Sequence, residues 1–225
     1  MTKAKGQADD ALRTLHEYSI LPDARELWLC GNPDSPTAKD DADEEPGVEF
    51  SMTDRFLKSL RWLALHSDTE PILIHMNTYG GDVHQGMALY HAIRSCPAPV
   101  SILNYAGARS MSAVILQAAD WRAMMPGSYF MFHMGTTAVE GDVQRVYSEL
   151  AFGRRYDRVV IDAWAAAMKA CPHGRFRSRS LDWIRKKLRA RMRDKTDVFL
   201  TPAEAVDWGL ADEVFDGDWP GLKKF

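Results

Sequence analysis

Short apolar runs alternate with helical patterns through the middle of this chain, and no other feature of the sequence constrains the fold as strongly. The runs at residues 71–76, 99–105 and 128–133 have the length and composition of buried strands. Apolar residues recur at helical spacing over 83–93, and a mainly apolar helical run occupies 111–119. Strands and helices in this order are typical of parallel βαβ units, so the sequence predicts an α/β fold.

Chemically distinctive residues stand at the ends of these runs. The pair Gly80-Gly81 follows the first run, Ser110 begins a helix, and His133 closes the third run. Open α/β sheets place active groups at the carboxyl ends of their parallel strands, so we expect these residues to lie together. A serine hydroxyl becomes nucleophilic when a neighbouring imidazole removes its proton. The pattern therefore predicts a serine nucleophile with a histidine base.

The same pattern offers donors for an oxyanion. Glycine lets the backbone approach a substrate closely and adopt positive φ, so the Gly80-Gly81 turn can supply one N–H. The N–H of Met111 lies in the first turn of a helix, where it has no intrahelical acceptor, and can supply the second. Two such donors stabilise the tetrahedral oxyanion of acyl transfer.

With these motifs in this order, the chain resembles the ClpP family, the proteolytic subunits of the ATP-dependent Clp protease. The resemblance covers roughly residues 25–214, with two interruptions. It rests on Ile74-His75-Met76-Asn77-Thr78-Tyr79-Gly80-Gly81, Ala108-Arg109-Ser110-Met111, Met131-Phe132-His133 and Asp197-Val198-Phe199-Leu200-Thr201-Pro202-Ala203-Glu204-Ala205-Val206.

The resemblance implies a role for each residue that matches a family motif. Ser110 is the implied nucleophile, His133 the general base, and Asp197 the acid that orients the histidine. Gly81 and Met111 are the implied donors to the oxyanion. Carried over in this way, the five residues form a complete serine peptidase site.

The chain also departs from the family pattern. Tyr79 replaces the usual proline before the glycines, and Ser112 replaces a glycine. Residues 135–141 only loosely resemble the glycine-rich strand that lines the substrate groove in the family. Asp194 is an alternative orienting acid, but the run Phe-Leu-Thr-Pro-Ala-Glu-Ala that follows Asp197 favours Asp197. The departures leave the implied triad intact and indicate a divergent copy, such as a phage, prophage or plasmid member.

We expect one peptidase domain over residues 25–215, preceded by an N-terminal arm over 1–24 and followed by a C-terminal tail over 216–225. Residues 33–47 are rich in Asp, Glu, Pro and Ser, which predicts a disordered acidic insertion. The implied fold is a ClpP/crotonase-like spiral of ββα units, with a protruding helical handle and helical extension over 135–195.

The implied activity is that of a serine endopeptidase that hydrolyses unfolded polypeptides inside an oligomeric chamber. The resemblance implies self-association into stacked rings and an AAA+ unfoldase as partner. The chain lacks the phosphate-binding pattern Gly-x-x-x-x-Gly-Lys-Ser/Thr, so ATP is expected to be used only by the unfoldase. No metal or organic cofactor is expected for cleavage.

Composition and charge indicate where such a protein works. Three cysteines, Cys30, Cys96 and Cys171, without C-x-x-C spacing, favour a reducing compartment. No signal peptide or membrane-spanning run is visible, so we expect a cytoplasmic protein. The net charge of −3 makes nucleic-acid binding an unfavoured interpretation. Residues 169–195 hold 11 of the 28 Lys and Arg, which predicts a solvated helix face or subunit contact rather than a nucleic-acid patch.

Several alternatives remain open at this point. A catalytically silent ring or scaffold subunit, a phage head-maturation protease and a crotonase-like acyl-CoA enzyme are compatible with parts of the pattern. An α/β-hydrolase esterase is disfavoured, because Ser110 is flanked by Ala108 and Ser112 instead of the two glycines of the nucleophile elbow. For metals, His84 and His91 could share a helix face, but two ligands do not make a site.

Overall fold

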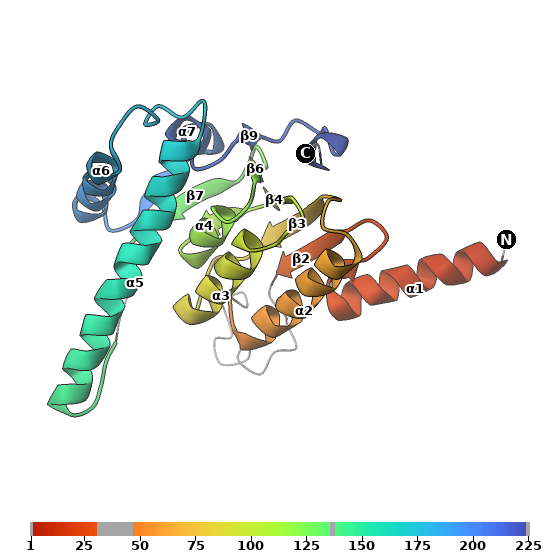
Figure 1. Cartoon of the computed structure of the whole chain (residues 1–225), viewed down its shortest axis with the longest axis horizontal. Coiled ribbons are helices and arrows are strands. Elements are labelled where there is room, and N and C mark those ends of the chain that lie inside the picture. Colours follow the sequence, from red (N-terminus) through yellow and green to blue (C-terminus); the bar gives the residue numbers. More distant parts are fainter. Residues whose placement is uncertain (1, 31–46, 136–137, 224–225) are drawn as a thin grey trace.

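The computed structural model describes residues 2–30, 47–135 and 138–223 (Figure 1). These residues form the mixed α/β architecture that the sequence predicts, with two sheets and flanking helices. The strands are β1 (Ile20–Leu21), β2 (Glu26–Cys30), β3 (Ile72–Asn77), β4 (Val100–Asn104), β5 (Gly107–Arg109), β6 (Trp121–Met124), β7 (Tyr129–Phe132), β8 (Val198–Leu200) and β9 (Glu213–Val214). The helices are α1 (Thr2–Tyr18), α2 (Phe50–His66), α3 (Val83–Arg94), α4 (Met111–Leu116), α5 (Val143–Ala170), α6 (Leu181–Asp194) and α7 (Pro202–Trp208), followed by a short 3-10 helix (Pro220–Lys223).

The larger sheet has the strand order β1-β2-β3-β4-β6-β9. From β2 to β9 neighbouring strands are parallel, whereas β1 runs antiparallel to β2. Side chains of β3 and β4 are buried on both faces, as parallel strands covered by helices require. The predicted parallel βαβ units are thus confirmed. Helices α2, α3 and α4 lie in front of these strands in Figure 1 and cover them.

A smaller sheet, in the order β5-β7-β8, positions the predicted site residues. Ser110 follows β5, His133 follows β7, and Asp197 precedes β8. Strands β7 and β8 are antiparallel, with Phe132 opposite Val198. This register brings His133 beside Asp197 although 64 residues separate them in the chain.

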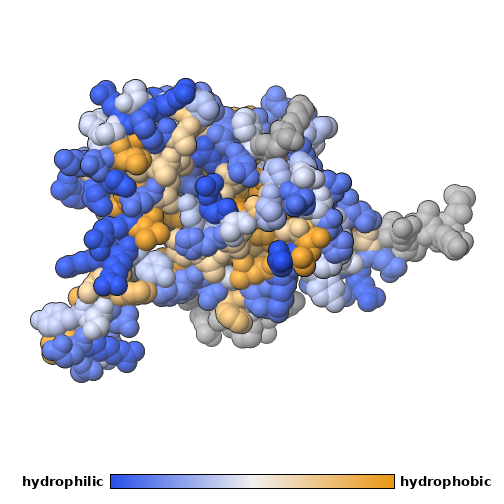
Figure 2. Space-filling view, viewed as in Figure 1, coloured by the Kyte–Doolittle hydropathy of each residue, from blue (hydrophilic) through white to orange (hydrophobic). Residues whose placement is uncertain are grey.

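The long helix α5, of 28 residues, extends beyond the body of the molecule, and α6 packs against its C-terminal part (Figure 1). The expected handle and extension therefore correspond to α5, α6 and the turn between them. Near its free end α5 exposes Val143, Tyr147 and Leu150, and apolar surface is visible around its middle (Figure 2). None of the described helices has both the length and the apolar content needed to cross a membrane.

The segments expected as an N-terminal arm and a C-terminal tail contain a helix, a strand and a buried residue. Most of the first segment is helix α1, which points away from the body (Figure 1). Ile20–Leu21 pairs with β2, so the sheet begins before residue 25. In the last segment Leu222 is fully buried, and its carbonyl accepts a hydrogen bond from Ser101. The predicted acidic insertion lies outside the described residues except for Gly47.

Candidate active site

Ser110 occupies a strained backbone position between β5 and α4. Its φ is +53° and its ψ is −124°, a region that residues with a Cβ atom rarely adopt. Holding one residue there costs roughly 1–3 kcal/mol, which the surrounding structure must offset. Every residue of α4 is buried, and the N–H of Ser110 donates to the carbonyl of Met131 over 3.1 Å. These contacts fix the direction in which the Ser110 hydroxyl points.

The predicted histidine and aspartate continue from this serine in a chain of contacts. Nε2 of His133 lies 2.9 Å from Oγ of Ser110. Nδ1 of the same ring lies 3.1 Å from Oδ1 of Asp197. An ionised carboxylate only accepts hydrogen bonds, so the ring proton lies on Nδ1 and is donated to Asp197. This pairing leaves Nε2 free to accept the serine proton. Of the two candidate acids, it is therefore Asp197 that contacts His133, whereas Asp194 ends α6.

The glycine turn lies against the backbone of the serine turn. A Cβ atom added to Gly80 would meet Arg109 O and Met111 N at 2.8 Å, so only glycine permits this approach. Val48 holds the turn from its other side, because its N–H donates to Gly80 O over 2.7 Å. Among the described residues, the N–H groups of Gly81 and Met111 have no hydrogen-bond acceptor. The residues of both predicted donors line the same cavity as Ser110.

Two departures from the family pattern have local explanations. Ser112, in place of glycine, is fully buried and its hydroxyl donates to the carbonyl of Thr78, which ties α4 to the glycine turn. Tyr79, in place of proline, is partly exposed, and the guanidinium of Arg109 lies 5.5 Å from its ring centre. Both substitutions therefore add contacts across the two turns and leave the position of Ser110 intact.

A cavity of about 410 Å³ opens beside Ser110 and His133. Its opposite wall is the middle of α5, where the side chains of Tyr156, Val160 and Trp164 lie. This size is within the range of clefts that hold small ligands or single substrate side chains. Ser110 and His133 themselves line this cavity, so a bound group would lie next to them.

Asp157, on the α5 wall of this cavity, is a candidate that sequence reasoning missed. Burial raises the pKa of its carboxyl group above the ordinary value, and the positive charge of Arg189 partly opposes the shift. The described residues offer Asp157 no hydrogen-bond partner and no ion pair within contact distance. A single aspartate in a long helical pattern has no sequence motif that marks it as functional. Its position beside the cavity is evident only from the packing of α5 against the serine turn.

The possible metal ligand His84 and part of the basic segment 169–195 make contacts that join elements of the fold. Nδ1 of His84 lies 3.2 Å from the hydroxyl of Tyr156 on α5, so His84 joins α3 to α5 instead of pairing with His91. In the basic segment, Arg185 pairs with Asp162 at 2.6 Å, and Arg179 lies 5.0 Å from the ring centre of Trp183. Part of the positive charge of this segment therefore holds α5, α6 and the intervening turn together.

An α/β protein that aligns a strained serine, a histidine and an aspartate beside a cavity has the geometry of a serine hydrolase. Residues 45–218 match the sequence profile of the Clp protease family. The chain therefore belongs to the Clp protease family and is a peptidase of the Clp type.

Two curated relatives illustrate the similarity. The ATP-dependent Clp protease proteolytic subunit of Deinococcus radiodurans is 28% identical over 172 residues, which cover 75% of this chain and 76% of the relative. The chloroplastic ATP-dependent Clp protease proteolytic subunit 3 of Arabidopsis thaliana is 25% identical over 177 residues. That match covers 78% of this chain but 52% of the Arabidopsis protein, so the chain spans about half of that relative.

Proposed function

We propose that this protein is a serine endopeptidase that hydrolyses peptide bonds of unfolded polypeptides. The proposal rests mainly on two hydrogen-bond contacts at the edge of the cavity, from Ser110 to His133 and from His133 to Asp197. The strained φ of Ser110 supports it, because strain of this kind is concentrated at functional sites.

In the proposed reaction, Oγ of Ser110 attacks the peptide carbonyl while Nε2 of His133 takes the hydroxyl proton. Asp197 accepts a hydrogen bond from Nδ1–H and stabilises the imidazolium that forms. The N–H groups of Gly81 and Met111 donate to the oxyanion of the tetrahedral intermediate. His133 then protonates the leaving amine, and water hydrolyses the acyl-enzyme by the same route in reverse. No step requires a metal or an organic cofactor.

The proposal extends to assembly and to partners. We infer that the subunits stack as rings and enclose the sites, since α5 presents exposed Val143, Tyr147 and Leu150 well away from the body. The names of both relatives describe ATP-dependent proteases. Because this chain has no phosphate-binding loop motif, the ATP would be hydrolysed by a separate AAA+ unfoldase that delivers unfolded chains in the cytoplasm.

A fluorophosphonate probe, read by intact mass, tests the serine assignment directly. We expect one adduct per subunit in the wild type, none in Ser110→Ala, and much slower labelling in Asp197→Asn. Asp194→Asn is the matched control, because it removes a nearby carboxylate that does not contact His133. The absence of an adduct on assembled wild type would overturn the proposal in favour of a silent ring or scaffold subunit.

Cleavage of a fluorogenic peptide then separates a peptidase from another serine hydrolase. The wild type should cleave the peptide, and the same two variants should lose activity in parallel with labelling. A protein that labels at Ser110 but cleaves only acyl thioesters would indicate crotonase-like acyl-CoA chemistry. A protein that cleaves only one viral capsid precursor would indicate head maturation.

A further inference from the structure

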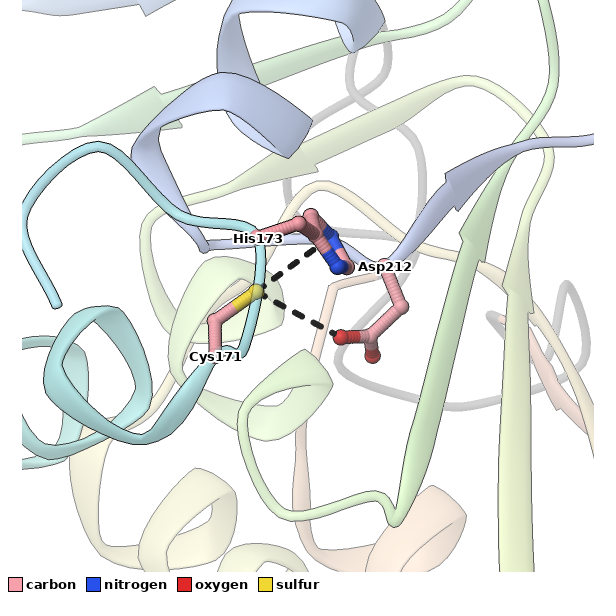
Figure 3. Close-up of side chains that lie close together, drawn as sticks. All are labelled: Cys171, His173 and Asp212. Atoms are coloured by element: carbon pink, nitrogen blue, oxygen red, sulfur yellow. Dashed lines mark hydrogen bonds between the residues drawn. The ribbon is translucent and has the colours of Figure 1, made fainter.

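A second cluster of reactive side chains lies away from Ser110, where the chain turns after α5 (Figure 3). Cys171 ends α5, His173 follows two residues later, and Asp212 comes from the turn between α7 and β9. Sγ of Cys171 lies 3.3 Å from Nε2 of His173 and 3.9 Å from Oδ1 of Asp212. One ligand atom from each residue lies within 4.8 Å of the others. The sequence pattern predicts no Cys/His metal site, because Cys171-Pro172-His173 matches none of the spaced motifs typical of zinc sites.

The two separations from sulfur are close to those around a tetrahedral zinc ion. With Zn–S of about 2.3 Å and Zn–N or Zn–O of about 2.0–2.2 Å, tetrahedral ligand atoms lie roughly 3.3–3.6 Å apart. The sulfur–nitrogen separation of 3.3 Å and the sulfur–oxygen separation of 3.9 Å each differ by only a few tenths of an ångström from roughly 3.6 Å, the separation expected for these pairs. The nitrogen and the oxygen lie within 4.8 Å of each other. Thiolate, imidazole and carboxylate are the three ligand types that zinc uses in proteins.

Asp212 is held in place by Arg122, which leaves one carboxylate position open. The backbone N–H and Nε of Arg122 donate to Oδ2 at 2.9 and 2.8 Å, and one terminal N–H group donates to Oδ1 at 2.8 Å. The second lone pair of Oδ1 remains on the side of Cys171. Ligating carboxylates are commonly oriented by such outer hydrogen bonds. A thiolate and a carboxylate beside one guanidinium leave a net negative charge for a divalent cation.

The cluster also has room for a fourth ligand. A cavity of about 310 Å³ is lined by Cys171 and Asp212, together with Gln117, Asp120 and Arg122. A water molecule from this cavity would complete a four-coordinate site, because the three side chains supply only three ligands. His173 lies on the exposed side of the cluster, which gives a metal ion a route of entry.

We propose that Cys171, His173 and Asp212 bind one Zn²⁺ ion per chain. The ion joins the segment after α5 to the turn before β9, and so fixes the base of the handle to the central sheet. It is separate from the serine site and has no step in the peptidase reaction. The proposal therefore does not depend on the proposed function.

Cobalt substitution tests the ligand set, because Co²⁺ takes the place of Zn²⁺ and reports thiolate coordination in its spectrum. Full-length protein is stripped of metal under a non-thiol reductant and titrated with Co²⁺ and then Zn²⁺. We expect one Co²⁺ per chain, a sulfur-to-cobalt charge-transfer band, and displacement of the cobalt by one equivalent of zinc. Zinc should also raise the melting temperature of the wild type.

Single substitutions identify the ligands. Cys171→Ser should abolish the charge-transfer band, and His173→Ala should weaken zinc binding by at least about tenfold, since even outer-sphere changes have effects of roughly 10- to 100-fold. Asp212→Asn should weaken binding while the sulfur band remains. Cys96→Ser and His91→Ala are the matched controls and should bind like the wild type. His173 is exposed, so its variant reports on binding even if Asp212→Asn fails to fold.

Three results would overturn the site. They are substoichiometric cobalt binding, bound cobalt without a thiolate band, and zinc affinity unchanged in Cys171→Ser or His173→Ala. Fluorophosphonate labelling of Ser110 provides an independent readout of the other site. We expect the rate of Ser110 labelling in Cys171→Ser to equal the rate in zinc-free wild type.

Discussion

Nε1 of Trp164 donates a hydrogen bond of 3.2 Å to the carbonyl oxygen of Ala113. Trp164 lies on α5 and is 1% exposed, whereas Ala113 lies in the first turn of α4, three residues after Ser110. This bond therefore connects the handle helix directly to the backbone that holds the candidate nucleophile. A displacement of α5 would therefore shift the backbone of Ser110, even if no triad residue is substituted.

Trp164→Phe removes this hydrogen bond and keeps most of the aromatic packing. We expect a loss of about 1–3 kcal/mol in the free energy of unfolding, because the Ala113 carbonyl is left buried without its partner. Labelling of Ser110 by a fluorophosphonate should slow as well. Urea denaturation and labelling rates measure the two effects. Trp183→Phe, at an exposed position of α6, is the control. Equal effects in both variants would contradict the proposed coupling.

Gly80→Ala tests the contact between the glycine turn and the serine turn. The added Cβ would lie 2.8 Å from Met111 N at a φ of +99°, so the turn has to move. We expect peptidase activity to fall on the order of 100-fold, as small misplacements of catalytic groups commonly cause. Gly127→Ala is the control, since no atom lies within 4 Å of its added Cβ. Full activity in Gly80→Ala would show that the turn does not position the oxyanion donors.

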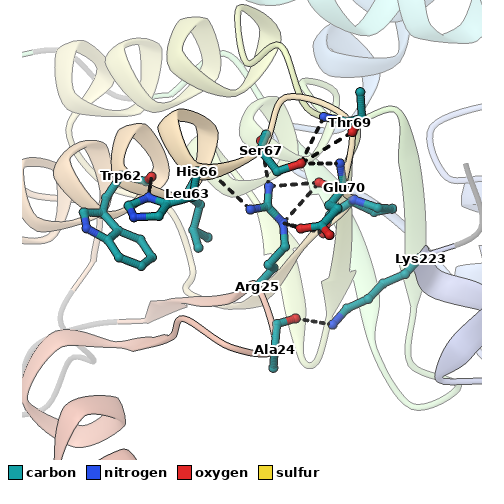
Figure 4. A network of polar contacts seen from close by, with 10 residues as sticks. Ala24, Arg25, Trp62, Leu63, His66, Ser67, Thr69, Glu70 and Lys223 are labelled. Atoms are coloured by element: carbon teal, nitrogen blue, oxygen red, sulfur yellow. Dashed lines mark hydrogen bonds and ion pairs between the residues drawn. The ribbon is translucent and has the colours of Figure 1, made fainter.

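Arg25 joins the start of β2 to the end of α2 (Figure 4). Its guanidinium donates to the carbonyls of Leu63, Ser67 and Glu70 at 3.1, 3.0 and 2.9 Å. The carbonyls of Ser67 and Glu70 lie beyond the helix end, where acceptors lack intrahelical donors. The Leu63 carbonyl, in the last turn, also accepts from the N–H of Ser67. Arg25→Ala should therefore lower the free energy of unfolding by about 2–4 kcal/mol. Thermal denaturation measures the loss, and Arg61→Ala, at an exposed position of α2, should stay within about 0.5 kcal/mol of wild type.

The central sheet was predictable from the sequence, whereas the smaller sheet was not. Strands β3 and β4 are runs of buried apolar residues bounded by polar turns, so local pattern suffices to find them. Strands β5 and β8 have three residues each, which is too short to show a period. Their pairing with β7 arises from contacts between distant parts of the chain. The burial of Leu222 could not be predicted either, because it also depends on contacts with a distant part of the chain.

The candidate site was found by motif, but its geometry required the structure. A serine at a helix start usually caps the helix, yet Ser110 makes no capping hydrogen bond and instead adopts positive φ. Asp197 was preferred over Asp194 from the residues that follow it, and the antiparallel register of β7 and β8 explains why only Asp197 reaches His133. No sequence motif marks Asp157, so its position on the cavity wall could be learned only from the tertiary packing.

Glu26 makes stability depend on acid pH. The hydrogen bond from His75 lowers the pKa of Glu26 to about 2, Lys223 adds to the effect, and burial opposes it. The folded state thus favours the ionised form, so this stabilisation is complete above pH 4.5 and is lost as pH falls toward 2. Glu26→Gln should reduce the free energy of unfolding by roughly 1–3 kcal/mol at neutral pH and flatten its decline in acid.

Urea denaturation at a series of pH values measures this dependence. Glu17→Gln on α1 is the matched control, because Glu17 pairs with Arg13 at the surface. A decline between pH 4.5 and 2 that is as steep in Glu26→Gln as in wild type would assign the acid sensitivity to other carboxyl groups.

Asp157 should influence which side chain enters the cavity beside Ser110. Its carboxylate lies on a wall that also holds Val160 and Trp164, so an alkyl chain that ends in a cation fits both surfaces. We expect peptides with Lys or Arg next to the cleaved bond to react faster than peptides with Glu. Asp157→Asn should reduce this ratio by about tenfold, which corresponds to ~1.4 kcal/mol. Because burial raises the pKa of Asp157, the preference should weaken in acid earlier than for an ordinary aspartate.

Paired fluorogenic peptides that differ only in that side chain measure the ratio of kcat/KM values. Asp162→Asn is the control, since Asp162 lies on the same helix but pairs with Arg185 outside the cavity. The ratio is informative only in protein that labels at Ser110, so a loss of activity is distinguished from a change of preference. An unchanged ratio in labelled Asp157→Asn would mean that substrate side chains bind elsewhere along α5.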